Sequence, residues 1–171
     1  LSVKAVQQAQ EMVSTAHAAL FLDDRPDRNI YERKITEWDS SCALFALRDG
    51  SVVKIPEGPM LLPSVTIQGI CALAKERGIE VQERDVTYGE LVEWVQNDQL
   101  VTICSIGTAG ILNRCTNLHL VDQDLKIIAK HTADSEHPLF QALGECRADY
   151  WKMYTGEKSL PESLVLEKHI L

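Results

Sequence analysis

Two short segments of the sequence offer backbone geometry suited to a bound anion. Residues 62–66 (Leu-Pro-Ser-Val-Thr) lead directly into a predicted helix, whose first N–H groups lack backbone partners and carry the positive end of the helix dipole. Residues 105–109 (Ser-Ile-Gly-Thr-Ala) follow a predicted buried strand, where small side chains let a ligand approach and Thr108 supplies a hydroxyl. Together they predict a two-sided phosphate cradle. Taken singly, each also fits a structural turn or helix start, with Ser64 or Thr66 acting as a cap.

One carboxylate and one thiol are further candidates for chemistry. Glu37 precedes Trp38 and an apolar strand, so its carboxylate could be a partly buried partner for a cationic ring nitrogen. The alternative is an ordinary solvated strand residue. Cys104 lies next to the glycine-containing turn and could act as a nucleophile, but the sequence places no histidine as its base.

Familiar catalytic and metal-binding motifs do not occur in this sequence. His119, His131 and His137 lack the spacing of metal ligands, and His137, which precedes Pro138, is interpreted as a helix-end residue. No G-x-S-x-G, H-E-x-x-H, G-x-G-x-x-G or Walker sequence is present. Hydrolase, metalloprotease and nucleotide-fold functions are therefore unsupported, and we expect no metal site.

The cysteines indicate a reducing compartment. They are odd in number and widely spaced, without a C-x-x-C pair, and the sequence has no N-x-[ST] glycosylation acceptor. We interpret them as free thiols of an intracellular protein, cytoplasmic or in an organelle. The five residues are Cys42, Cys71, Cys104, Cys115 and Cys146.

Composition narrows the class of protein. The 171 residues include 45% hydrophobic and 25% charged residues, which is typical of a globular domain. A net charge of −8 argues against binding to a nucleic-acid backbone. No apolar run reaches the length of a membrane span, about 18 residues. The sequence begins Leu-Ser-Val-Lys without a signal-peptide pattern or an initiator Met, so we expect that residues upstream are missing.

Patterning predicts an α+β domain that would position the candidate residues. A tight hairpin is indicated by Asp49-Gly50 between two apolar runs, and a capping box at residues 87–90 opens a helix. The predicted helices span 3–14, 66–77, 87–97 and 138–154. The predicted strands span 18–22 (taken as buried), 34–37, 42–47, 51–55, 80–86, 100–104, 111–112 and 118–121.

The order of these pieces resembles a known enzyme family. The segments that carry the resemblance are Ile-Thr-Glu at 35–37, Leu-Phe at 44–45, the Asp-Gly hairpin, Leu-Pro-x-Val-Thr at 62–66, Gly-Ile-Glu-Val at 78–81 and Gly-Thr-Ala at 107–109. The chain resembles the fold-type IV (class IV) pyridoxal-phosphate enzymes, which include branched-chain and D-amino-acid aminotransferases and aminodeoxychorismate lyase. The resemblance implies the C-terminal large domain of that fold, a mixed-strand pseudo-barrel flanked by helices, over residues 1–157, with a tail at 158–171.

The resemblance also implies a cofactor, a reaction and site residues. Pyridoxal 5'-phosphate would be held by Glu37 at its pyridine nitrogen and, around its phosphate, by Ser64, Val65, Thr66, Gly107 and Thr108. The backbone of Thr108 and Ala109 would face the substrate carboxylate. The reaction would transfer an amino group between an amino acid, the branched-chain ones among the candidates, and a 2-oxo acid. Family members are commonly homodimers, which the resemblance implies here as well.

Several departures from the family pattern leave alternatives open. The family's Schiff-base lysine falls upstream of Leu1, and Lys4 is not its counterpart, so that lysine would lie in a missing part or in a separate N-terminal fragment. The stretch from Glu37 to Leu-Phe is one residue longer than usual, so either residues 38–41 hold an insertion or Trp38 takes the carboxylate position. Ser64 stands where the family favours Gly, and Ile106 where Ser or Thr is common.

Two other functions follow from these departures. A degenerate homologue without pyridoxal phosphate could serve as a binding or assembly module. The same pocket could instead perform lysine-independent chemistry on another anionic ligand.

Overall fold

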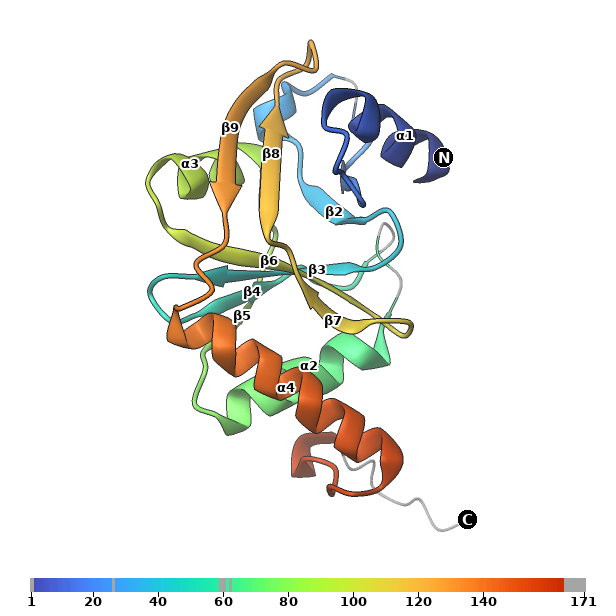
Figure 1. Ribbon diagram of the computed structural model, residues 1–171, viewed down its shortest axis with the longest axis vertical. Coiled ribbons are helices and arrows are strands. Elements are labelled where there is room, and N and C mark those ends of the chain that lie inside the picture. Colours follow the sequence, from blue (N-terminus) through green and yellow to red (C-terminus); the bar gives the residue numbers. More distant parts are fainter. Residues whose placement is uncertain (1, 26, 59–60, 62, 165–171) are drawn as a thin grey trace.

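The computed structural model describes residues 2–25, 27–58, 61 and 63–164 (Figure 1). Its helices are α1 (Ser2–Met12), α2 (Val65–Glu76), α3 (Tyr88–Gln96) and α4 (Pro138–Thr155), with short 3-10 turns η1 (Ile30–Glu32) and η2 (Glu162–Leu164). Its strands are β1 (Leu20–Leu22), β2 (Ile35–Trp38), β3 (Cys42–Leu47), β4 (Val52–Lys54), β5 (Val81–Glu83), β6 (Leu100–Gly107), β7 (Ile111–Arg114), β8 (Asn117–Val121) and β9 (Ile127–Thr132).

A five-stranded sheet forms the middle of the molecule, in the order β5-β4-β3-β6-β7. The β3–β4, β3–β6 and β6–β7 pairs are antiparallel, whereas β4 and β5 run parallel. The β3–β4 turn places Gly50 at a φ of 91°, which confirms the predicted hairpin. The α+β class and the mixed strand directions are confirmed. Strand pairing within the described residues gives this sheet and two separate two-stranded sheets, β1-β2 and β8-β9, and no closed barrel.

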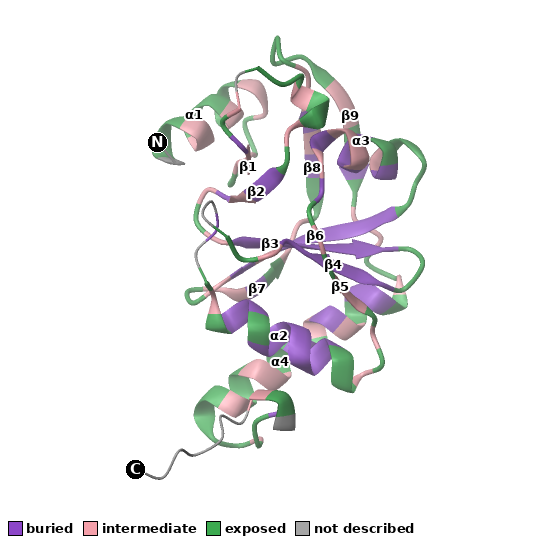
Figure 2. Cartoon of the chain, turned by 180° about the vertical axis from the view of Figure 1, so that it is seen from behind, coloured by how far each residue is buried: buried purple, intermediate pink, exposed green. Residues whose placement is uncertain are grey.

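The strands of the central sheet are largely buried (Figure 2), and an apolar cluster packs on each of its faces. On one face, Phe45 and Val53 pack with Leu91 of α3, Ile35 of β2 and Leu118 of β8. On the other face, α2 and α4 cover a second cluster. Alternation along β3 divides its side chains between the two layers, because successive strand residues point to opposite faces. The start of β3 is therefore held by packing on both faces of the sheet.

Helix ends follow the sequence signals closely. Ser64, Thr87 and His137 cap α2, α3 and α4 at their N-termini. Gly78 and Gly156 take positive φ values of 75° and 80° after α2 and α4. The interpretation of His137 as a helix-end residue is therefore confirmed. The helical predictions agree with the observed helices to within a few residues.

Three strand predictions differ from the structure. The segment 18–22 was expected to be a buried strand, but β1 covers Leu20–Leu22 and is only half-buried, because its sheet has just two strands. β5 is shorter than the predicted 80–86. β9 was not predicted, since Lys130 and His131 interrupt its apolar run; pairing with β8 forms it.

The tail joins the domain at its first residues. Lys158 donates from Nζ to Oδ2 of Asp149 on α4 at 2.6 Å, and η2 contacts α2. The division into a domain at 1–157 and a tail at 158–171 stays a prediction, and residues 165–171 lie outside the described residues. No helix in the described part is long and apolar enough to cross a bilayer.

Candidate functional site

Several of the predicted site residues lie near the start of β3. A tight turn brings the chain from β2 into β3, with the N–H of Trp38 donating to the carbonyl of Ser41 at 2.8 Å. Cys42 then pairs with Ile106 on β6, and the hydroxyls of Ser41 and Ser105 are 2.6 Å apart. A Cβ at Gly107 would lie 3.3 Å from Cβ of Ser41, so this close approach favours glycine.

The N-terminus of α2 meets the same place. The Oγ of Ser64 accepts from the N–H of Ile67 at 3.4 Å, and burial raises the pKa of the Cys42 thiol while the neighbouring Ser64 side chain partly offsets this rise. Val65 is 78% exposed, whereas Thr66 is buried. Within the described part of the chain, no hydrogen bond uses the N–H groups of Val65 or Thr66. The first turn of α2 thus has donors without a partner among these residues, as is usual at a helix start. Leu62 lies outside the described residues.

Glu37 lies half-buried on β2 at this junction. Burial raises the pKa of its carboxyl group. Burial likewise raises the pKa of the Cys42 thiol, and the negative charge of Glu37 raises that pKa further. No ion pair of Glu37 occurs among the residues that the structure describes. Its carboxylate is desolvated without a compensating cation, and a cationic partner would therefore stabilise it.

Trp38 has a different role from its neighbour. Its indole is buried, and Nε1 donates to the carbonyl of Cys104 at 3.2 Å. The side chain thus joins the turn before β3 to β6. Of the two residues considered for the carboxylate position, only Glu37 is a half-buried acid at the junction.

Thr108 and Ala109 face another part of the molecule. They follow β6 in the turn to β7 and line a hollow of about 490 Å³ whose other wall is α4. Gly110, Ile111, Gly144, Arg147, Ala148 and Trp151 complete the lining. The candidate residues therefore divide into a group around Ser41 and Cys42 and a pair that also opens toward α4. No lining residue of this hollow belongs to the first group.

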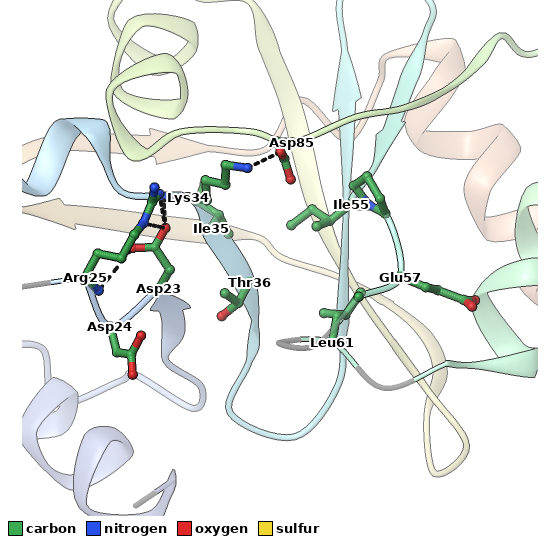
Figure 3. A pocket seen from close by; sticks show the side chains of 12 residues that line it. Asp23, Asp24, Arg25, Lys34, Ile35, Thr36, Ile55, Glu57, Leu61 and Asp85 are labelled. Carbon is green, nitrogen blue, oxygen red and sulfur yellow. Dashed lines mark hydrogen bonds and ion pairs between the residues drawn. The ribbon is translucent and has the colours of Figure 1, made fainter. Parts of the chain in front are cut away.

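A second hollow was not predicted from the sequence. It measures about 470 Å³ and lies between the β1–β2 sheet and the loop from β4 to α2 (Figure 3). Ile35, Ile55 and Leu61 line it with apolar side chains. Some of its charged residues come from polar loops, whereas Lys34 and Asp85 come from predicted strands, and no motif distinguished them.

Ion pairs hold the charged rim of this second hollow. Arg25 pairs with Asp23, and Lys34 pairs with Asp85 (Figure 3). The bond from Arg25 lowers the pKa of the Asp23 carboxyl group to about 2. Asp23 also accepts from the backbone N–H of Lys34 at 2.9 Å. These side chains are paired with one another, and the bonds to Asp23 hold the loop after β1 in place.

The remaining candidates have structural positions. Cys104 is fully buried, and this burial raises the pKa of its thiol to about 12, so a thiolate nucleophile is disfavoured. The buried ring of His131 contacts the carbonyl of Val101 through Nε2 at 3.1 Å. All five cysteines are unpaired. No cluster of metal-ligating side chains occurs among the described residues.

Comparison with known proteins identifies relatives of one kind. No family model matches the chain. It is 38% identical over 107 residues to branched-chain-amino-acid aminotransferase 6 of Arabidopsis thaliana, covering 63% of this chain and 27% of that protein. It is 29% identical over 109 residues to a "probable branched-chain-amino-acid aminotransferase" of Staphylococcus aureus, covering 64% of this chain and 30% of that protein.

The fold agrees with these sequence matches. The branched-chain amino acid aminotransferase of Thermobaculum terrenum, solved in its PLP-bound holo-form, superposes with a TM-score of 0.61 and 22% identity, over 90% of this chain and 42% of that one. By these matches the chain is related to the class IV pyridoxal-phosphate-dependent aminotransferases over part of their length. It spans less than half the length of the relatives that it matches.

Proposed function

We propose that this chain is the C-terminal, cofactor-binding portion of a pyridoxal-phosphate-dependent transaminase. The transaminase would move an amino group between an amino acid, the branched-chain ones among them, and a 2-oxo acid. The relatives' names support this substrate class. The Schiff-base lysine would be supplied outside this sequence, either upstream or on a separate N-terminal fragment. A homodimer in the cytoplasm is the assembly and location that we propose.

The single observation that carries the proposal is the desolvated carboxylate of Glu37, which has no cationic partner among the described residues. A pyridinium nitrogen is a cation of the kind that this carboxylate lacks, so the residues present fit the cofactor. Pyridoxal phosphate, when bound, supplies the electron sink of the reaction. Glu37 would keep a proton on the ring nitrogen, because the negative charge of a carboxylate favours the protonated ring.

The start of α2 would bind the phosphate. Val65 and Thr66 would offer their backbone N–H groups, since a helix N-terminus favours an anion, and Thr66 would add its hydroxyl. Ser64 orients this turn through its contacts with Ile67 and Cys42. Gly107 lets β6 approach the β2–β3 turn closely. These groups would act by binding and orientation.

The turn after β6 would serve the phosphate and the substrate. The hydroxyl of Thr108 would add a donor to the phosphate, and the N–H groups of Thr108 and Ala109 would meet the substrate carboxylate. Because this turn borders open solvent on the α4 side, the rest of the transaminase would have to exclude water from the reacting end. We therefore expect this chain alone to bind cofactor more weakly than the whole enzyme.

Borohydride reduction of the natively purified protein tests the proposal. The treatment fixes a lysine-bound cofactor covalently, so denaturing mass spectrometry then reports chain length and cofactor together. We expect a pyridoxyl adduct on a longer chain or on a second polypeptide. A lone chain of 19.1 kDa without adduct would contradict the proposal and would favour the homologue that acts as a binding module or uses lysine-independent chemistry.

Two threonine variants test the phosphate site. Thr66→Ala and Thr108→Ala should each weaken pyridoxal-phosphate binding by tens-fold, because hydrogen bonds to a charged group contribute about 1.5–3 kcal/mol. Thr116→Ala, at an exposed threonine on the way from β7 to β8, is the matched control. Fluorescence titration measures all four proteins. Unchanged affinity in both site variants would remove the phosphate assignment.

A further inference from the structure

The hollow between the β6–β7 turn and α4 has two walls of different character. One wall is the turn, with the small residues Thr108, Ala109 and Gly110. The other is a face of α4 that carries Arg147 and Trp151. These two side chains lie four residues apart, so they project from the same side of the helix. A cation and a large flat ring thus border one open space of about 490 Å³.

The two walls are held at a fixed separation. The guanidinium of Arg114 on β7 lies over the ring of Phe140, 4.1 Å from its centroid, and Nη1 donates to the carbonyl of Phe140 at 2.9 Å. A Cβ at Gly144 would lie 2.9 Å from the same Nη1. Glycine at this position therefore lets Arg114 reach across to α4. The hollow is bounded by elements that are already docked.

Four other arginines of the chain have acidic partners, whereas Arg147 has none among the residues that the structure describes. The four are Arg25, Arg48, Arg77 and Arg84. Arg147 is also exposed. A guanidinium binds carboxylate or phosphate through two parallel N–H groups. Since the chain carries a net charge of −8, an unengaged arginine beside a hollow is a localised attraction for an anion.

Trp151 supplies an apolar surface beside this charge. It is 54% exposed and stacks on Tyr154 with ring centroids 5.6 Å apart. Trp38 and Trp94 are buried, so Trp151 is the one tryptophan whose ring is open to solvent. The stack limits the rotation of the indole and leaves part of its surface uncovered. An aromatic ligand would gain from contact with it.

The backbone of the turn is strained at the edge of the hollow. Ile111 has a φ of 61°, a conformation that β-branched residues rarely adopt. The fold thus holds the backbone of Ile111 in an unfavourable conformation at the edge of the hollow. Backbone strain of this kind is concentrated at functional sites. This strain supports the placement of a ligand at the turn, but the charge and the ring define its chemistry.

We propose that this hollow binds a small ligand in which an anionic group is attached to a flat aromatic ring, such as an aryl phosphate or aryl carboxylate. Arg147 holds the anion, Trp151 contacts the ring, and the turn at Thr108 closes the far side. The site shares the turn at Thr108 with the proposed cofactor site, but Arg147 and Trp151 lie on α4, apart from Glu37 and the start of α2, and ligand binding to them can be measured without pyridoxal phosphate. Its test therefore uses no cofactor.

The exposed indole provides a direct test. The protein has three tryptophans, so a proton–nitrogen correlation spectrum contains three indole N–H signals, and Trp151→Phe identifies the one of interest. Phenyl phosphate should shift the Trp151 signal saturably and leave the signals of Trp38 and Trp94 in place. Inorganic phosphate should bind about tenfold more weakly, because it lacks the ring. The absence of a saturable shift would overturn the proposal.

A matched pair of arginine variants completes the test. Arg147→Gln should weaken phenyl phosphate by about tenfold or more, since it removes a charge-assisted contact. Arg28→Gln removes the same charge from an exposed loop before η1 and should leave the affinity unchanged. Equal affinity of Arg147→Gln and the unmodified protein would overturn the site. Equal weakening in both variants would show attraction by net charge alone, which also overturns it.

Discussion

The hollow beside β2 and the hollow beside α4 are similar in size but differ in the pairing of their cations. In the hollow beside β2, Arg25 and Lys34 have carboxylate partners. In the hollow beside α4, Arg147 has none among the described residues. The difference indicates that the first set of charges stabilises the loops around it. The second remains available to a ligand.

Burial explains the difference between the two sites. Asp23 is only 7% exposed, and a buried carboxylate must be hydrogen-bonded or paired to remain ionised. Arg147 lies on an exposed helix face, where water satisfies its guanidinium. An unpaired charge at a surface therefore costs the fold little.

Asp23→Ala should be strongly destabilising. The substitution removes the acceptor for the backbone N–H of Lys34 and for the guanidinium of Arg25, so the free energy of unfolding should fall by about 2–3 kcal/mol. Asp24→Ala, at the exposed neighbour, should change it by less than about 0.5 kcal/mol. Urea unfolding of both variants measures the difference. Equal effects would mean that the Asp23 network does not stabilise the loop.

Acid should weaken the fold through two carboxylates. The pKa of Asp23, bonded by Arg25, and that of Asp149, bonded by Lys158 and Arg77, are both lowered to about 2. Each therefore stabilises the protein above the unfolded pKa near 3.8, and this contribution is lost as the pH falls from about 4 through 2. The loss should be about 1–2 kcal/mol for each group after screening.

Urea unfolding at two pH values, near neutrality and in strong acid, measures this loss. The double variant Asp23→Asn and Asp149→Asn should be less stable near neutral pH and should lose less on acidification. The double variant Asp24→Asn and Asp27→Asn, at exposed positions, is the control with the same change in charge. A double variant as acid-sensitive as the unmodified protein would contradict the assignment of the two carboxylates.

The smallest effects separate the two arginines directly. Arg25→Gln should lower the free energy of unfolding by roughly half as much as Asp23→Ala, because it removes the cation but leaves the bond from the Lys34 N–H in place. Arg147→Gln should change it by less than about 0.5 kcal/mol, since no partner among the described residues is lost. Thermal and urea unfolding measure both. A destabilised Arg147→Gln variant would show that this residue serves the fold.

Local sequence signals predicted most of the elements. The caps Ser64 and Thr87 and the turn glycines Gly50 and Gly78 work through neighbours in the chain, so their patterns predicted element ends well. β9 escaped prediction because its residues become a strand only by pairing with β8. The half-buried state of β1 likewise depends on the size of its sheet. Contacts between residues far apart in the sequence determine whether such a segment forms a strand and how deeply it is buried.

The candidate site was predicted only in part, because local signals indicate single segments and not the contacts between them. The sequence indicated Ser64, Thr66 and Thr108 as anion-suited, because helix starts and small-residue turns have known backbone geometry. It did not show that Cys42 joins these segments through Ser64 and Ile106. It also did not indicate Arg147 and Trp151, which read as ordinary residues of a solvated helix face.

By itself, the sequence determined the α+β class, the helix ends and the family resemblance, since these follow from propensity, capping and local motifs. The tertiary structure alone decided which charges are paired and which remain open. Ion pairing depends on distances of a few ångströms between side chains far apart in the chain, as between Lys34 and Asp85. Burial decides whether an unpaired group is costly, as for Glu37, or free to bind, as for Arg147.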